Sequence, residues 1–91
     1  MKSEKYNNAI FNHPIEIEVD YNEDQQEYIV LCDYLDEYGE SMTELLAKRD
    51  LVESLVCTYK VLSKSDDRIL GQMMKEYKRR FLEVINAKAC M

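Results

Sequence analysis

The side chains with the most reactive chemistry in this 91-residue chain are one histidine, His13, and three cysteines, Cys32, Cys57 and Cys90. Nucleophilic catalysis needs a base that a rigid scaffold holds beside the nucleophile, whereas His13 stands next to Pro14 near the N-terminus. The cysteines are odd in number and widely spaced, with no Cys-x-x-Cys pair, which argues against a disulfide framework or a zinc site. We therefore expect Cys32 and Cys57 to be buried, inert thiols and Cys90 to be a free thiol near the C-terminus, with no bound metal and a reducing compartment.

Carboxylates suggest two further kinds of chemistry. The segment 20–24, DYNED, matches three ligand positions of an EF-hand loop, but the sixth position is not glycine and the twelfth is not glutamate. Asp33, Asp36 and Glu37 could exchange protons, yet no pocket signature accompanies them. With two glycines in the whole chain, no phosphate-binding loop can be built. We expect a protein that is not an enzyme and that uses no cofactor.

Charge is distributed very unevenly along the chain. Residues 1–47 carry twelve acids and two bases, whereas residues 48–91 carry six acids and ten bases, within a net charge of -6. No lysine or arginine occurs between Lys5 and Lys48. Uncompensated carboxylates repel one another and weaken the compact state, and soluble surfaces usually mix the two signs. The acidic half is therefore the feature with the greatest bearing on what this protein contacts.

Length and composition indicate a single folded domain over residues 1–91. An apolar fraction of 46% and seven tyrosines separate the chain from acidic disordered sequences. Residues 1–13 are mostly polar and are expected to form a flexible arm or a short helix. The first residues lack the apolar run of a signal peptide, and no stretch approaches the ~20 apolar residues of a membrane span. The expected location is the cytoplasm.

The clearest strand pattern runs from Ile15 to Tyr21, where apolar and acidic residues alternate without interruption. The apolar side chains at its odd-numbered positions should face a core. Glu16, Glu18 and Asp20 should face water, spaced about 7 Å apart along the strand.

Residues 22–38 fit two structures. In the first, a turn follows and Tyr28–Cys32 returns as a second strand, which supplies the hydrogen-bond partner that the preceding strand needs. In the second, Asn22 caps a helix that ends before Gly39. In a helix, the β-branched residues Ile29 and Val30 would point away from the apolar face and into solvent. The hairpin is therefore favoured.

Two long helices should follow. Ser41-Met42-Thr43-Glu44 reads as a capping box, and apolar residues at helical spacing continue to about Leu62 or Ser63. A second helix should begin at Ser65-Asp66-Asp67, with its aspartates at the positive end of the helix dipole. It carries an apolar stripe made of Leu70, Met74, Tyr77, Phe81 and Val84. Because so few residues separate the two helices, we expect them to pair antiparallel.

The predicted fold class is therefore α+β: a two-stranded antiparallel hairpin packed on an antiparallel pair of long helices. The alternative is an all-α three-helix bundle with an extended N-terminal arm. The two differ in the structure of residues 22–38.

Acids and tyrosines lie side by side within the acidic half. Tyrosine is enriched at the energetic centres of protein interfaces, and surrounding carboxylates favour a basic partner. The expected partner-binding residues are Glu16, Glu18, Asp20, Asp33, Tyr34, Asp36, Glu37, Tyr38 and Glu40. A net charge of -6 repels nucleic acid at long range, so we expect no direct binding of nucleic acid and none of membranes.

This size and charge resemble those of small phage-encoded anti-defence proteins, which include anti-CRISPR proteins and other DNA mimics. The resemblance implies an inhibitor that displays carboxylates where phosphates would lie. Such an inhibitor occupies the basic groove of a nuclease or another nucleic-acid-binding protein, and it would act in the host cytoplasm.

Two other functions compete with this one. A ββα beginning with a capped helix is similar to antitoxins of the HicB kind, in which sheet and helix clamp a small basic toxin. The third is a small dimeric adaptor or regulator, a homodimer in which the stripe at Leu70, Met74, Tyr77 and Phe81 pairs with a second copy.

Overall fold

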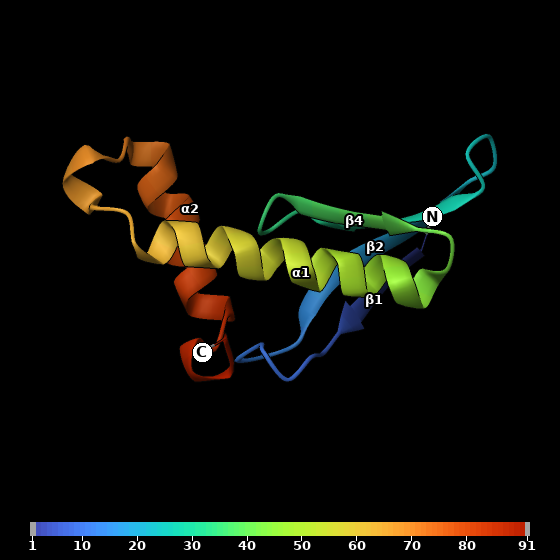
Figure 1. Ribbon diagram of the computed structural model, residues 1–91, viewed down its shortest axis with the longest axis horizontal. Helices are drawn as coiled ribbons and strands as arrows, with labels where there is room; N and C mark the ends of the chain where they lie inside the picture. The colour runs from blue at the N-terminus through green and yellow to red at the C-terminus, as the bar shows by residue number, and fades with distance from the viewer. Residues whose placement is uncertain (1, 91) are drawn as a thin grey trace.

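A computed structural model describes residues 2–90 of the protein and shows a four-stranded antiparallel sheet packed against helices (Figure 1). The strands are neighbours in chain order, β1-β2-β3-β4. Their bounds are β1 Lys2–Tyr6, β2 Ile15–Asn22, β3 Glu27–Cys32 and β4 Glu37–Ser41. The α-helices are α1 Glu44–Ser63 and α2 Gln72–Val84, and short 3-10 helices lie at Asp67–Ile69 and Ala87–Cys90. Within residues 2–90, no helix combines the length and the hydrophobicity needed to cross a bilayer.

The strand predicted from alternation is β2, and its alternation divides the side chains between core and solvent. Ile15, Ile17 and Val19 are at most 4% exposed, whereas Tyr21, which was also expected to face the core, is 44% exposed and packs against Tyr28. Glu16 and Asp20 on the opposite face are exposed. This division is the expected consequence of the two-residue period of a strand.

β2 and β3 form the antiparallel hairpin that the sequence favoured over a helix, with Val19 opposite Val30. Asn22 caps the turn rather than a helix: its Oδ1 accepts hydrogen bonds from the backbone N–H groups of Asp24 and Gln25 at 3.0 and 3.3 Å. Gln26 completes the turn with a positive φ of 55°. The all-α alternative is therefore wrong.

The predicted two-stranded sheet is also wrong, although the α+β class agrees, because each edge of the hairpin gains a further strand. β1 pairs with β2, placing Lys2 opposite Val19, so the segment expected to be an arm or a short helix begins as a strand. β4 pairs with β3, placing Gly39 opposite Val30. Neither KSEKY nor EYGES has an alternating apolar pattern. They are strands because β2 and β3 each present an edge of backbone donors and acceptors that must be paired.

Helix α1 begins two residues later than the predicted capping box. Thr43 is the N-cap, and its Oγ1 accepts a hydrogen bond from the backbone N–H of Leu46 at 3.1 Å. Ser41 is instead the last residue of β4, where it pairs with Tyr28. The end of the helix at Ser63 agrees with the sequence prediction.

The second helix departs further from its prediction. Asp66 caps only a 3-10 turn, accepting from the backbone N–H of Arg68 at 2.9 Å, and α2 starts at Gln72 with Gly71 as its N-cap. Residues 64–71 therefore form a longer connection than expected and redirect the chain. As a result, α2 crosses the C-terminal part of α1 steeply and does not run antiparallel beside it (Figure 1).

The C-terminal part of α2 is tied to the loop between β1 and β2. The backbone N–H of Asn12 donates to the carbonyl of Val84, and that of Asn86 donates to the carbonyl of Ile10, both at 2.7 Å. Phe11 forms an isolated bridge with Ile85. These contacts close one core, whose buried members are Phe11, Ile15, Ile17, Val19, Val30, Cys32, Leu35, Ala47, Leu51, Leu55, Tyr59, Leu62, Phe81, Val84 and Ile85.

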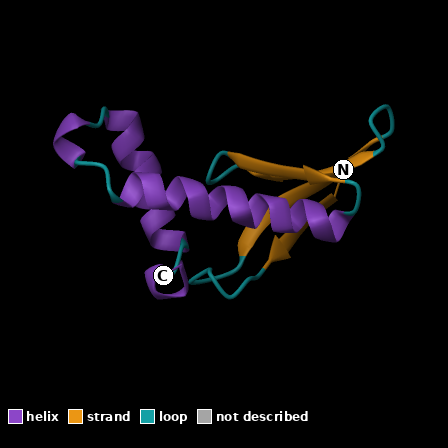
Figure 2. Cartoon of the chain, in the orientation of Figure 1, coloured by secondary structure: helices purple, strands orange, loops and turns teal. Residues whose placement is uncertain are grey.

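Helix α1 lies across one face of the sheet (Figure 2) and comes closest to it at Gly39 of β4. A Cβ atom on Gly39 would overlap the backbone of α1 at Ala47 and Leu51. The helix also protects the edge of β4, because the Asp50 carboxylate accepts a hydrogen bond from the backbone N–H of Glu40 at 3.0 Å. The absence of a side chain at position 39 is thus what allows the helix to sit on the strand.

We predict that Gly39→Ala destabilises the fold by roughly 1–3 kcal/mol or more, because the clash is with helix backbone that cannot rotate away. Gly71→Ala is the matched control. It adds the same methyl group where no atom lies within 4 Å, and should cost roughly 1 kcal/mol or less, the scale of a poorer N-cap. Urea unfolding followed by circular dichroism measures both. Equal losses in the two variants would contradict the close approach of α1 to β4.

Candidate functional site

The register of the sheet brings part of each predicted acidic segment onto one surface. Glu18 of β2 lies opposite Leu31 of β3, which lies opposite Tyr38 of β4. One row further along, Asp20 lies opposite Ile29, and Ile29 opposite Glu40. Because residues directly opposite in an antiparallel pair share a face, all of these side chains point away from α1. We call this surface the open face; its residues are Ser3, Lys5, Glu16, Glu18, Asp20, Ile29, Leu31, Tyr38 and Glu40.

The open face has an apolar centre and an acidic margin. Ile29 and Leu31 are half-buried in the middle strand β3, and Tyr38 beside them is 57% exposed. Glu16 and Asp20 on β2 and Glu40 on β4 are exposed on either side of that strand. An apolar strip with one aromatic ring, rimmed by charge, has the composition of a protein interface.

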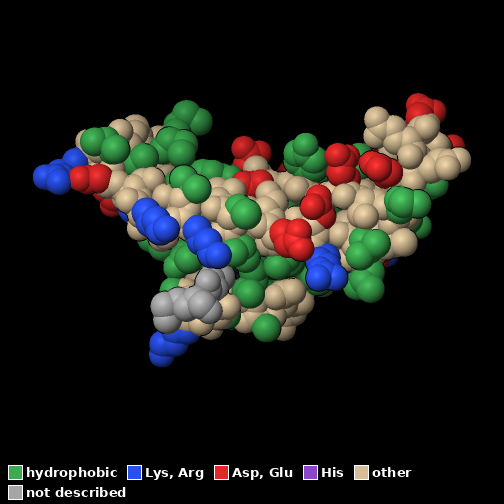
Figure 3. Space-filling model, in the orientation of Figure 1, with side chains coloured by type: hydrophobic (Ala, Val, Ile, Leu, Met, Phe, Trp, Pro, Cys, Tyr) green, Lys and Arg blue, Asp and Glu red, His purple; other side chains and the backbone are tan. Residues whose placement is uncertain are grey.

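Most of the lysines near the sheet form ion pairs with carboxylates that are not on the open face. Lys48 contacts Glu4 at 2.8 Å and Glu44 at 3.1 Å, and Lys2 contacts Glu44 at 3.0 Å. Among the residues described, Lys5 is the one base of the open face. On the face that α1 presents, acidic side chains gather over the sheet end and basic ones mainly over the helical end (Figure 3).

Three acids of the open face, Glu16, Glu18 and Glu40, form no ion pair within the described part of the chain, although Lys5 of β1 lies opposite Glu16. Carboxylates about 7 Å apart on a strand repel one another by roughly 2 kcal/mol at an effective dielectric constant of 20. A cationic partner would remove that repulsion.

The loop between β3 and β4 joins the open face to α2. Asp33 lies in a shallow hollow of about 130 Å³ together with Glu16, Glu18 and Leu31. Tyr34 is fixed toward α2: its hydroxyl donates to Glu83 at 2.8 Å.

The Glu83 carboxylate affects the ionisation of Tyr34. It accepts a hydrogen bond from the Tyr34 hydroxyl, which stabilises the protonated phenol and raises the pKa of Tyr34 above its usual value. Arg80 also fixes the loop, because its guanidinium lies 4.9 Å from the centre of the Tyr34 ring. The loop is thus held against α2 by two hydrogen bonds, Tyr34 to Glu83 and Arg80 to the Tyr34 carbonyl, and by one cation–π contact.

Two residues of the predicted binding set point away from the open face. Asp36 adopts a positive φ of 51° in the turn before β4 and lines a hollow against α2. Glu37 is half-buried and faces the helices, because the two-residue period of β4 places it opposite in direction to Tyr38.

Glu37 is the centre of a cluster of hydroxyl groups. It accepts hydrogen bonds from Ser54 at 2.7 Å, Thr58 at 2.6 Å and Tyr77 at 3.2 Å. No described lysine or arginine forms an ion pair with it. Hydrogen bonds to a charged group are worth about 1.5–3 kcal/mol each, so this carboxylate holds β4, α1 and α2 together. Burial, and then the nearby Glu37 carboxylate, raise the pKa of Tyr77 above its usual value of 10.0.

The side chains with catalytic or ligating potential are dispersed. His13 lies 3.8 Å from Glu83, and Cys32 is buried in the core, where desolvation raises the pKa of its thiol. Cys57 was expected to be buried, but this prediction is wrong, because its side chain is exposed on α1. Among residues 2–90, no three His, Cys, Asp or Glu side chains are grouped so that they could hold a metal ion.

Sequence reasoning missed Ile29 and Leu31 as members of the surface. Their signal was present in EYIVLC, where the residues that alternate with the buried Val30 and Cys32 must face the other way. This alternation assigns Ile29 and Leu31 to the open face only if residues 27–32 form a strand. In a helix, residues two apart do not share a face.

The fold is thus an α+β sheet-and-helix domain with one sheet face left open, and the candidate site is a surface rather than an enclosed pocket. The chain matches no protein-family model, and neither a curated protein nor a solved structure shows significant similarity to it.

The hydroxyl cluster around Glu37 predicts how stability changes at high pH. The folded protein holds the Tyr77 proton more tightly than the unfolded chain, so the free energy of unfolding should fall as the pH rises above about 10. Tyr77→Phe has no phenol to ionise, and its stability should fall less steeply over roughly pH 10–12. Urea midpoints measured across this range give the slope.

Tyr38→Phe is the control for this titration, because Tyr38 is 57% exposed on the open face. Its slope should match that of the unaltered protein. If Tyr77→Phe and the unaltered protein lose stability at the same rate with pH, the pKa of Tyr77 is not raised in the folded protein.

Proposed function

We propose that this protein is a binding protein, not an enzyme, and that its open face docks onto a basic surface of another protein. The observation that carries the proposal is the combination of acids that form no ion pair among the described residues, Glu16, Glu18 and Glu40, with an apolar strip at Ile29 and Leu31 on one uncovered sheet face. Either feature alone is common on protein surfaces. Together they offer both the charge that guides association and the apolar area that holds a complex.

The most specific form of the proposal is an inhibitor that competes with nucleic acid. Proteins that bind nucleic acid carry clustered lysine and arginine along a phosphate-binding surface. When no phosphate is bound, those side chains repel one another, and a row of carboxylates relieves the repulsion. Such a partner would be a nuclease or another nucleic-acid-binding protein in the cytoplasm, as in phage anti-defence proteins of the DNA-mimic type. Tyr38 would provide the central aromatic contact.

The arrangement of the sheet supports a protein-sized partner over a small ligand. Two hollows lined by open-face residues measure about 130 and 230 Å³, which is below the 300–1,000 Å³ of typical ligand pockets. The rows from β1 to β4 form a broad surface, and neighbouring strands are spaced about 4.8 Å apart. The hypothesis therefore concerns an interface and not a pocket.

Capture from a cytoplasmic extract tests the proposal. The protein is immobilised through Cys57, which is exposed on α1 and so lies on the side away from the open face, in a Cys90→Ser background that leaves a single accessible thiol. The extract is treated with nuclease and loaded at low salt. Bound proteins are then eluted by increasing salt or by added DNA or RNA, and identified by mass spectrometry. A basic nucleic-acid-binding protein that is released by both salt and nucleic acid is the expected result.

The matched variants are two double charge reversals. Glu16→Lys with Glu18→Lys alters the open face, and Glu23→Lys with Asp24→Lys makes the same change of net charge in the exposed turn between β2 and β3. The first should weaken binding to the captured protein about tenfold or more, a change of roughly 1.4 kcal/mol, mainly through slower association. The second should change binding less than about threefold.

Equal effects of the two double reversals would exclude the open face as the contact. A captured protein that stays bound in high salt, or that binds together with nucleic acid, would exclude the competitive mechanism. A small basic protein that has no affinity for nucleic acid would point to the antitoxin hypothesis in its place.

A further inference from the structure

Only the C-terminal part of the apolar stripe of α2 is buried in the core. Phe81 is 0% exposed, but towards the N-terminus of the helix Met74 is 43% exposed and Met73 87%, and Ile69 in the preceding 3-10 helix is 81% exposed. Apolar side chains gather over this end of the molecule, at the upper left of Figure 3. The stripe therefore continues beyond the edge of the domain and presents apolar surface that no described residue covers.

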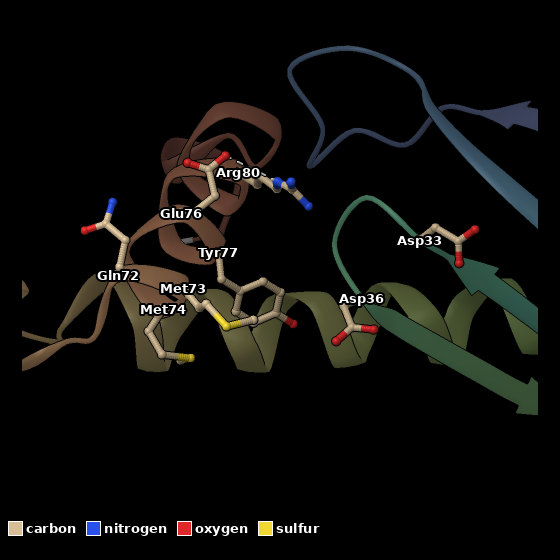
Figure 4. A pocket seen from close by; sticks show the side chains of 8 residues that line it. All are labelled: Asp33, Asp36, Gln72, Met73, Met74, Glu76, Tyr77 and Arg80. Atoms are coloured by element: carbon tan, nitrogen blue, oxygen red, sulfur yellow. Dashed lines mark ion pairs between the residues drawn. The ribbon is translucent and has the colours of Figure 1, made fainter.

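A hollow of about 660 Å³ lies between this part of α2 and the β3–β4 loop. Figure 4 shows its two walls: Asp33 and Asp36 come from the loop side, while Met73, Tyr77 and Arg80 project from α2. The volume falls within the range of sites that hold a bulky group. Methionine is flexible and polarisable, and is common at surfaces that accept varied apolar side chains.

The charge of the hollow is negative once its own contacts are counted. Arg80 already lies over the Tyr34 ring and donates to the Tyr34 carbonyl at 3.2 Å. It also lies 3.5 Å from Glu76, the third carboxylate of the lining. Asp33 and Asp36 form no ion pair among residues 2–90. An occupant that buries the methionines must therefore place positive charge beside these two aspartates.

We infer that this hollow binds an amphipathic basic helix of a partner protein, with one bulky apolar side chain between Met74 and Tyr77 and a lysine or arginine beside Asp33 and Asp36. Residues three or four apart on a helix lie on the same face, so an apolar residue and a base at that spacing would reach both walls. This is the helix-in-groove mode of recognition.

The inference extends the proposed function and rests on it, because Asp33 lines both this hollow and the hollow on the open face. A partner seated on the open face would reach the helix groove across the β3–β4 loop. The open face would then supply long-range attraction, and the methionine hollow would supply the apolar anchor.

Methionine methyl NMR tests the inference with a defined probe. The protein is labelled with ¹³C at its methionine methyl groups and titrated with a synthetic helical peptide made of leucine and lysine. The signals of Met73 and Met74 should shift. Met42, which is 76% exposed before the start of α1, should not shift and serves as the internal control. A peptide with serine in place of leucine, and one with glutamate in place of lysine, should each bind at least tenfold more weakly.

Two sets of substitutions make the test specific. Met73→Gln alters an 87% exposed side chain and should weaken the leucine–lysine peptide about threefold or more without changing stability. Asp33→Asn with Asp36→Asn should weaken it about fivefold or more, and asparagine tolerates the positive φ at position 36. The matched control, Glu23→Gln with Asp24→Asn, should leave peptide affinity within twofold.

Equal shifts at Met42 and Met73, or equal binding of the leucine–glutamate peptide, would overturn the inference. Shifts of Met73 and Met74 that appear on concentrating the protein alone would show that a second copy fills the hollow, and would also overturn it. A different result tests the proposed function. It would be contradicted if the Glu16→Lys with Glu18→Lys variant captured the partner as well as the unaltered protein does, and the peptide titration does not affect this test.

Discussion

The close contact between α1 and β4 at Gly39 is the constraint on which the rest of the structure depends. Because position 39 has no side chain, the backbone of α1 at Ala47 and Leu51 lies directly on the strand. The helix then covers one face of the sheet and protects the edge of β4 through Asp50. A short polar segment, EYGES, becomes a strand because it is held between β3 and the helix.

That contact also decides which carboxylates can meet a partner. With Gly39 facing α1, the alternation of β4 turns Glu37 towards the hydroxyls of α1 and α2 and turns Tyr38 outward. The segment DYLDEYGE is therefore divided among three environments: the loop against α2, the interior between sheet and helices, and the open face. A surface that looked continuous in the chain is discontinuous in space, whereas Glu18 and Tyr38, which are distant in the chain, share one row.

The two charged halves of the chain have different structural roles. Bases of α2 are largely paired locally, as Arg79 is with Glu76 at 2.6 Å and Glu83 at 3.4 Å. They therefore do little to neutralise the sheet. The open face keeps acids that form no ion pair among the described residues, and α2 keeps two methionines, Met73 and Met74, that are 87% and 43% exposed. Repulsion between the acids and exposure of the apolar side chains both destabilise the isolated domain. A basic, partly apolar partner that covered these surfaces would reduce both effects.

The sequence by itself determined the elements whose signals are local. Strict alternation identified β2, a β-rich run identified β3, and helical periodicity identified α1 to its last residue. The tertiary structure alone decided the edge strands, the cap at Thr43 and the inward direction of Glu37. It also decided that α2 crosses α1 steeply and that the N-terminal part of α2 extends beyond the core. The physical reason is that strand pairing and helix crossing are set by partners distant in the chain: KSEKY becomes a strand because β2 has an unpaired edge, and α2 crosses α1 because Phe81 and Val84 must reach the core beside Phe11.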